Sequence, residues 1–162
     1  MTKGQLQVET PRFESGKAML VAGLRGHFNA ASWQGIPAQW ERLAAYGKVA
    51  GQIGSVHYGL CFNMSDGVDY LAGAEVSGTA AVAAGFTSVN LPPQKYVVFQ
   101  HREHVSKLYH TVEAIWREWF PASGHEVAPP PPDSPGFFER YGEGFDPQTG
   151  MGDVEVWIPI KS

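Results

Sequence analysis

Cysteine, basic charge and long apolar runs are all scarce in this chain of 162 residues. Cys61 is the single cysteine, so an internal disulfide framework is excluded and a reducing, cytoplasmic location is expected. Lysine and arginine number 12 against 16 acidic residues, and no basic stripe marks a surface for nucleic acid. No apolar run approaches the roughly 18 residues of a membrane span, so we expect no membrane partner.

Large aromatic side chains, by contrast, are abundant. They form 12% of the chain and include five tryptophans, within a total of 43% hydrophobic and 17% charged residues. A chain of this length forms one domain with a sizeable core or two small fused modules. The aromatic content exceeds what such a core needs, so we expect a lined cavity or an interface.

Apolar periodicity predicts the order strand, strand, helix, strand, strand twice along the chain. The first set is expected at 8–13, 17–24, a helix around Trp40, 58–62 and 69–76. The second set is expected at 86–89, 96–99, a helix over 105–119, 137–141 and 154–160. A stretch of small residues at 80–85 is expected to link them. Two half-sheets, each covered on one face by a helix, would leave two opposed faces with a cleft between them.

One carboxylate interrupts the apolar segment 154–160. Strand side chains alternate between faces, so Glu155 shares a face with Trp157. The opposite face carries the expected core residues Val154, Val156, Ile158 and Ile160. An ionised carboxylate beside an indole and out of water is costly unless something pairs with it. Either that face is solvated, or Glu155 awaits a partner, for which a cationic ligand is the first candidate.

Four segments of the second half follow one another in an order that is typical of a known family. They are 96–101 (YVVFQH), 116–124 (WREWFPASG), 138–141 (FERY) and 154–161 (VEVWIPIK), and 70–76 (YLAGAEV) of the first half fits the same pattern. In this ordered set the chain resembles the GyrI-like family, the effector-binding domain of AraC-type and MerR-type multidrug regulators. The resemblance extends over nearly the whole chain.

The resemblance implies an α+β fold with antiparallel sheets. It implies two tandem strand-helix-strand-strand modules, about 8–80 and 86–162, within a single domain 1–162, and a ligand cleft between the two halves. By a Glu-x-x-Ile-Pro-Ile match, it implies that Glu155 is the anionic residue of an aromatic pocket for a lipophilic cation. The sequence departs from the family at Glu103, where many members have glycine. No DNA-binding module is identified, so we expect a stand-alone sensor.

Aromatic residues offer a wall for such a ligand. Trp157 shares the face of Glu155. Tyr58, Leu60 and Phe62 share one face of their strand, and Tyr141 shares a face with Glu139. Periodicity leaves open which aromatic set lines a cleft and which fills the core. The candidate ligand-binding residues are Glu155, Trp157, Tyr141, Tyr58, Phe62 and Leu71. Three further tryptophans fall on helix faces and are expected to pack against the sheet, namely Trp40, Trp116 and Trp119.

Other reactive residues form no recognisable site. His101 and His104 lie three residues apart, but a strand-to-helix junction separates them and a metal needs three or four converging ligands. We therefore expect no metal and no cofactor. Cys61 has no activating neighbour in the sequence and is expected to be a buried strand residue. The proline run 129–132 could dock an SH3-type groove, but a stiff surface loop is the simpler expectation.

Three functions stay open at this point. The first is a small-molecule-binding protein for lipophilic, cationic ligands that makes no direct contact with nucleic acid. The second is a hydrolase of strained electrophilic small molecules, with Glu155 as general base and Tyr141 or Tyr58 beside it. The third is a protein-binding modulator such as a gyrase inhibitor, which the family's name suggests and a net charge of −4 permits.

Overall fold

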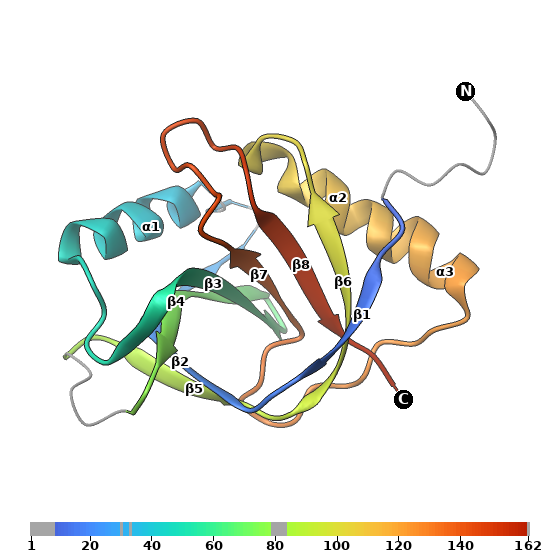
Figure 1. Cartoon of the computed structure of the whole chain (residues 1–162), viewed down its shortest axis with the longest axis horizontal. Coiled ribbons are helices and arrows are strands. Elements are labelled where there is room, and N and C mark those ends of the chain that lie inside the picture. Colours follow the sequence, from blue (N-terminus) through green and yellow to red (C-terminus); the bar gives the residue numbers. More distant parts are fainter. Residues whose placement is uncertain (1–8, 30, 33, 79–83, 162) are drawn as a thin grey trace.

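The computed structural model describes residues 9–29, 31–32, 34–78 and 84–161. In this part the chain forms one curled antiparallel sheet with few helices (Figure 1). The strands are β1 (Arg12–Gly16), β2 (Met19–Phe28), β3 (Gln52–Met64), β4 (Gly67–Val76), β5 (Thr87–Leu91), β6 (Gln94–His101), β7 (Phe137–Tyr141) and β8 (Val154–Pro159). The helices are α1 (Gly35–Tyr46), α2 (Leu108–Ala114) and α3 (Phe120–Ser123), with a 3-10 turn η1 (Val105–Lys107) and a π-helical turn η2 (Ile115–Trp119). None of these described helices is long and apolar enough to cross a membrane.

Two bent segments, β1–β2 and β5–β6, run side by side and connect opposite ends of the sheet. The strand order is β1-β6-β8-β7-β3-β4-β2-β5, so β1 pairs with β6 at one end and β5 pairs with β2 at the other. The register continues through the bend, because Gly16 pairs with Gln94 and Met19 pairs with Leu91. Pro92 and Pro93 stand at the bend, where the missing proline N–H interrupts no ladder. The four strands therefore form one folded ribbon that curls the sheet.

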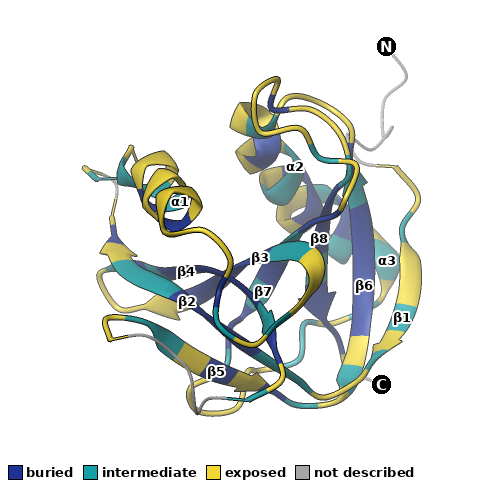
Figure 2. Ribbon diagram, turned by 60° about the vertical axis from the view of Figure 1, so that its left-hand side comes forward, coloured by how far each residue is buried: buried dark blue, intermediate teal, exposed yellow. Residues whose placement is uncertain are grey.

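Alternation along the strands separates an inner core from a helix-covered face. Inside the curl, Leu60 and Leu71 from the middle of the sheet pack with Val89 and Val98 from its two ends. The other face carries two cores, one under α1 and one under α2 and η2. Figure 2 shows α1 and α2 on the same side of the sheet, above strands that are mostly buried. The middle of β3 and most of β4 and β8 are therefore buried from both sides.

The faces of the last two strands agree with the sequence prediction. β7 occupies the predicted 137–141, and Val154, Val156 and Ile158 all belong to the core under α2. Trp157 points the other way and packs against the inner core. Period-two alternation of apolar residues was therefore sufficient to orient β8.

Other boundaries differ from the prediction. β1 lies at Arg12–Gly16 rather than at 8–13, and β2 and β3 extend well beyond 17–24 and 58–62. The two halves are not separate half-sheets, because β3 pairs with β7 and joins them into one sheet. The expected linker at 80–85 lies mostly outside the described residues.

Candidate ligand site

Glu155 of β8 points into the inner core, and its side chain is only 7% exposed. Arg12 Nη1 of β1 lies 2.8 Å from Glu155 Oε2, and Trp157 Nε1 donates to Oε1 at 3.0 Å. Arg140 Nη1 lies 3.6 Å from Oε1. Burial acts to raise the pKa of Glu155, but the bonds from Arg12 and Trp157 outweigh it, so the pKa is lowered. The chain itself thus supplies the cation that this carboxylate requires.

The other sequence-predicted site residues divide between the two faces of the sheet. Four of them lie in or against the inner core, namely Tyr58, Phe62, Leu71 and Trp157. Tyr141 belongs to the core under α2, on the opposite face. The structure therefore groups Glu155 with four of its five predicted companions. It places Glu155 and Tyr141, the candidate catalytic pair, on opposite sides.

An open groove of about 540 Å³ lies at the bend of the folded ribbon. It is lined by residues of β2 and β5, by the bend and by the loop before β7, namely Ala18, Met19, Leu20, Asn90, Leu91, Pro92, Pro131 and Ser134. None of the six sequence-predicted ligand residues is among them. The groove has no charged lining residue that would select a cation.

A second glutamate, Glu139 of β7, occupies the helix-covered face at the junction of the two halves. The hydroxyls of Tyr70 and Tyr141 both donate to Glu139 Oε1, each at 2.7 Å. Tyr70 comes from β4 and Tyr141 from β7, so the carboxylate is held from both halves of the sheet. Among the described residues, Glu139 forms no ion pair, in contrast to Glu155.

The two oxygens of Glu139 have different surroundings. Oε1 accepts both tyrosine hydroxyls, whereas Oε2 has no hydrogen-bond partner in the described part of the chain and is not sealed from solvent. The residue as a whole is half-buried. Desolvation raises the pKa of Glu139, and the two tyrosine bonds only partly oppose this effect. Glu139 therefore presents one open carboxylate oxygen with no cation of its own.

Aromatic side chains from both halves lie next to the two tyrosines that hold this carboxylate. Trp40 of α1 and Phe137 of β7 each pack against the cores under α1 and under α2. The Trp40 ring lies edge-on to Tyr70 and Tyr141, with centroids 6.2 and 5.3 Å apart. Trp116 of η2, which is 36% exposed, meets Phe137 edge-on at 6.2 Å. The position thus brings aromatic rings close to the residues that hold a negative charge, and both features attract an organic cation.

Gly59 of β3 makes room for this arrangement. It pairs directly opposite Glu139 in the ladder between β3 and β7. A Cβ at position 59 would lie 2.1 Å from the Tyr70 hydroxyl oxygen and 2.8 Å from Glu139 Oε1. Any larger residue would therefore occupy the space in which Tyr70 reaches the carboxylate.

Sequence reasoning did not single out Glu139 as a site residue. The usable signal was the alternation of β7, which places Glu139 on the same face as Tyr141. Nothing local in the sequence shows that Tyr70 arrives from another strand or that Arg12 neutralises Glu155 rather than Glu139. Those facts depend on the strand order.

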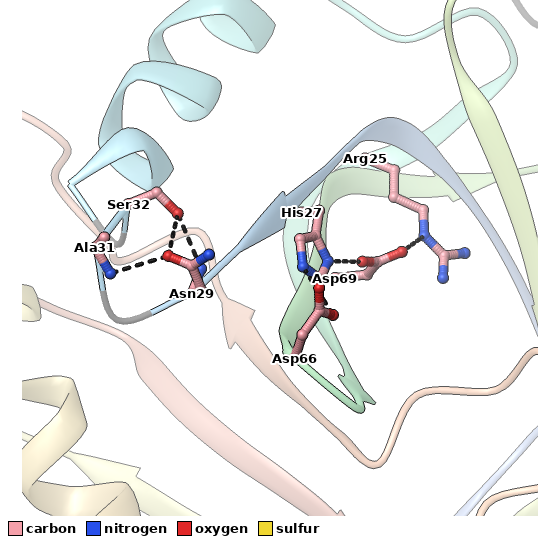
Figure 3. Close-up of polar contacts among 7 residues, drawn as sticks. All are labelled: Arg25, His27, Asn29, Ala31, Ser32, Asp66 and Asp69. Carbon is pink, nitrogen blue, oxygen red and sulfur yellow. Dashed lines mark hydrogen bonds and ion pairs between the residues drawn. The ribbon is translucent and has the colours of Figure 1, made fainter.

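A further polar cluster lies where β2 and β4 meet the turn before β4 (Figure 3). His27 Nδ1 lies 2.7 Å from Asp69 Oδ1, and His27 Nε2 lies 3.2 Å from Asp66 Oδ1. Arg25 Nε donates to Asp69 Oδ2 at 3.0 Å. The hydrogen bond with Asp69 raises the pKa of His27. No group of three His, Cys, Asp or Glu in the described residues could hold a metal ion, so this cluster is an ion-pair network.

Known proteins similar to this chain match it over almost its full length. The GyrI-like small-molecule-binding domain matches residues 9–161. Transcriptional regulator BrlR from Pseudomonas aeruginosa is 30% identical over 157 residues, which cover 94% of this chain and 54% of BrlR. The chain thus spans about half the length of that curated relative.

Solved structures with the same fold include two close matches. SAV2435, in a structure bound to tetraphenylphosphonium, has a TM-score of 0.73 at 22% identity, and the match covers 95% of each chain. A protein from Staphylococcus aureus MU50 has a TM-score of 0.72 at 21% identity, and the match covers 94% of this chain and 99% of that protein's chain. At these identities the likeness establishes the curled antiparallel fold.

Proposed function

The chain belongs to the GyrI-like small-molecule-binding domains, and from this premise we propose that it binds a lipophilic organic cation on the helix-covered face of its sheet. Glu139 supplies the negative charge in this proposal, the partly exposed Trp40 supplies aromatic surface, and Tyr70 and Tyr141 hold the carboxylate in place. One observation carries the proposal. Among the described residues, Glu139 is a half-buried carboxylate with one open oxygen and no ion-pair partner.

The surroundings of Glu139 would strengthen its attraction for a cation. Opposite charges interact more strongly where water is excluded. The raised pKa of Glu139, caused by desolvation, means that its ionised form is costly without a partner, and a bound cation offsets that cost. Each good cation–π contact adds about 0.5–2 kcal/mol. The tetraphenylphosphonium bound to SAV2435 supports this class of ligand.

Glu155 is the alternative anionic residue, as the family pattern implies. A cation that binds Glu155 would have to compete with Arg12, whose Nη1 lies 2.8 Å from the carboxylate. A cation at Glu139 would form a new ion pair without displacing one. Since replacing an existing pair gains less free energy than forming one, this difference favours Glu139.

A tandem duplication would explain why the site lies at the centre of the sheet. If each strand of the first half is exchanged with its counterpart in the second half, so that β1 exchanges with β5 and β4 with β8, the strand order of the sheet is reversed but otherwise unchanged. The strands β3 and β7, which carry Gly59 and Glu139, pair at the midpoint of that order. The ligand would then lie between the modules at about 8–80 and 86–162, on strands that each module contributes once.

Calorimetric titration with tetraphenylphosphonium tests the proposal, with triphenylphosphine oxide as a neutral aryl control. We expect Glu139→Gln to weaken tetraphenylphosphonium binding about 30-fold or more, the usual cost of removing one partner of a buried charge pair. The same variant should leave binding of the neutral compound nearly unchanged. Glu155→Gln serves as the matched control and should retain binding of the cation.

Two results would contradict the proposal. Loss of binding in Glu155→Gln with retention in Glu139→Gln would move the site to the inner core. Equal affinity of the unchanged protein for the cation and for the neutral compound would remove charge selection altogether.

A hydrolase is the second candidate function, and the same carboxylate favours it. Glu139 would take a proton from a water molecule while the water oxygen bonds to an electrophilic ring carbon and the bond from that carbon to the ring heteroatom breaks. The heteroatom would leave with the electron pair and then receive the proton from Glu139. Tyr70 and Tyr141 would hold the carboxylate in place, and its raised pKa suits a general base. Mass spectrometry of a bound strained-ring compound distinguishes the two functions. An unchanged compound at saturation indicates binding alone.

A further inference from the structure

A hydrogen-bond chain connects the proposed ligand carboxylate to helix α1. Trp40 Nε1 of α1 donates to the Tyr70 hydroxyl at 3.0 Å, and that hydroxyl donates to Glu139 Oε1 at 2.7 Å. The Tyr70 hydroxyl oxygen thus accepts a hydrogen bond from Trp40 of the helix, and the same hydroxyl donates a hydrogen bond to Glu139. These two hydrogen bonds connect α1 through β4 to β7.

Helix α1 is attached to the sheet by few buried contacts. Only Gln39 and Leu43 are buried among its 12 residues, and Gln34 at its start makes no side-chain cap. Gln39 Nε2 donates to the main-chain oxygens of Leu24 at 2.6 Å and Tyr70 at 2.8 Å. Two of the hydrogen bonds that attach α1 to the sheet are therefore made to Tyr70.

The same anchor leaves one group unsatisfied. Gln39 Oε1 is buried and has no hydrogen-bond partner within the described residues. An unsatisfied buried acceptor costs about 1–3 kcal/mol. The unsatisfied acceptor thus reduces the free energy that holds α1 on the sheet. A change in one other hydrogen bond would therefore alter the docking of α1 measurably.

We propose that Tyr70 is a positioning residue that couples ligand charge at Glu139 to the docking of α1. The inference rests on the proposed function, since it takes Glu139 as the residue that meets the cation. A cation paired with Glu139 Oε2 holds the carboxylate in the orientation in which Oε1 accepts from Tyr70, and so strengthens the hydrogen bond from Tyr70. Hydrogen bonds in a chain polarise one another, so the Tyr70 oxygen then becomes a better acceptor for Trp40. Cation binding should therefore tighten α1 against the sheet.

Tyr141 offers a matched control within the same site. Its hydroxyl donates to the same Glu139 oxygen at the same 2.7 Å distance. Its contact with Trp40 is between rings, with centroids 5.3 Å apart, and that contact would survive replacement by phenylalanine. Tyr141→Phe thus removes an equivalent bond to the carboxylate while leaving the Trp40 link intact.

Hydrogen exchange of the α1 amides, with and without saturating tetraphenylphosphonium, tests the coupling, and calorimetry on the same samples reports binding. In the unchanged protein and in Tyr141→Phe, we expect the cation to slow exchange in α1 about fivefold, the lower range of coupling between sites. In Tyr70→Phe, at the tetraphenylphosphonium concentration that calorimetry shows to saturate this variant, we expect exchange in α1 to stay unchanged. Exchange in α2, which lies outside the chain of bonds, should respond equally in all three proteins.

Trp40→Phe removes the hydrogen bond from Trp40 to Tyr70. This variant tests the coupling if Tyr70→Phe no longer binds tetraphenylphosphonium. Binding without an α1 response in Trp40→Phe supports the coupling. An α1 response that persists in Tyr70→Phe or in Trp40→Phe overturns it, as does binding to the unchanged protein with no change in α1. Absence of tetraphenylphosphonium binding to the unchanged protein would instead overturn the proposed function, and the inference with it.

Discussion

Glu139 and Glu155 lie on neighbouring strands, yet they face opposite sides of the sheet and have opposite electrostatic surroundings. Glu155 is neutralised by Arg12, which lowers its pKa against the effect of burial. Glu139 receives only hydroxyl groups, and desolvation leaves its pKa raised. A lowered carboxyl pKa stabilises the folded state above the unfolded pKa, whereas a raised one destabilises it there. The two residues should therefore respond oppositely to the same substitution.

Glu155→Gln should lower the free energy of unfolding at pH 7 by about 1.5–3 kcal/mol, the range for a hydrogen bond to a charged group. Glu139→Gln should raise it, because glutamine keeps the acceptor for Tyr70 and Tyr141 without a desolvated charge. That gain should shrink as the pH falls through the raised pKa of Glu139, where the carboxyl is itself neutral. Urea titrations at pH 7 and pH 5 measure both effects.

The sign of the two changes is the decisive outcome. If Glu139→Gln destabilises the ligand-free protein as strongly as Glu155→Gln does, then Glu139 serves the fold rather than a ligand. We expect Glu139→Gln to be more stable and to lose cation binding. Opposite effects of this kind are typical of a residue that is retained for function.

His27 should make stability depend on pH in the same direction as Glu139 does, because a raised folded pKa makes stability fall as the pH rises in both cases. Its pKa is raised by Asp69, so the His27 contribution is fully present below about pH 6.5, the ordinary histidine value. It is lost as the pH rises through the raised folded pKa. We expect His27→Gln to lower the melting temperature at pH 5.5 and to have no effect at pH 8.5.

Asp69→Asn provides the control for this titration. The His27 effect at pH 5.5 should nearly vanish in the Asp69→Asn background, because Asp66 is then the remaining carboxylate beside the imidazole. An undiminished His27 effect in that background would show that Asp69 does not set the response. Because His27 is exposed, added salt should weaken the effect.

At the level of elements, the sequence predicts what short-range periodicity controls. β7 and β8 alternate cleanly, and their positions and faces follow from that pattern. The predicted helix at 105–119 is observed as a series of turns that ends in α3, with the π-helical turn η2 inside it. Pro121 follows that turn and has no N–H to give to a preceding carbonyl, a constraint that alters helix geometry without ending the helix. Periodicity of apolar residues does not report such changes.

Strand pairing between distant segments is what the sequence could not provide. Arg12 meets Glu155 only because β1 pairs with β6, which in turn pairs with β8. Tyr70 meets Glu139 only because β4 and β7 flank β3. The sequence therefore identified Glu155 as a charge that needs a partner, but it could not say that the partner is Arg12.

The folded ribbon determines how the whole molecule should behave when it is divided. β1 precedes β2 in the chain but pairs with β6 of the second half, and β5 pairs with β2 of the first. The inner core likewise combines Leu60 and Leu71 with Val98 and Phe138 from the other half. Each half thus lacks one of its edge strands and half of its inner core when it is alone.

We therefore expect fragments 1–80 and 81–162 to be largely unfolded when separate and to fold when mixed. A duplicated ancestry would not make them independent, because the exchanged strands β1 and β5 must find their partners in the other fragment. Circular dichroism and amide NMR dispersion of each fragment and of the equimolar mixture measure this. A well-dispersed spectrum from fragment 81–162 alone would show that β6, β7 and β8 with α2 suffice for a fold. In that case the β1 contact through Arg12 and Glu155 would be an addition to a stable half rather than a condition for it.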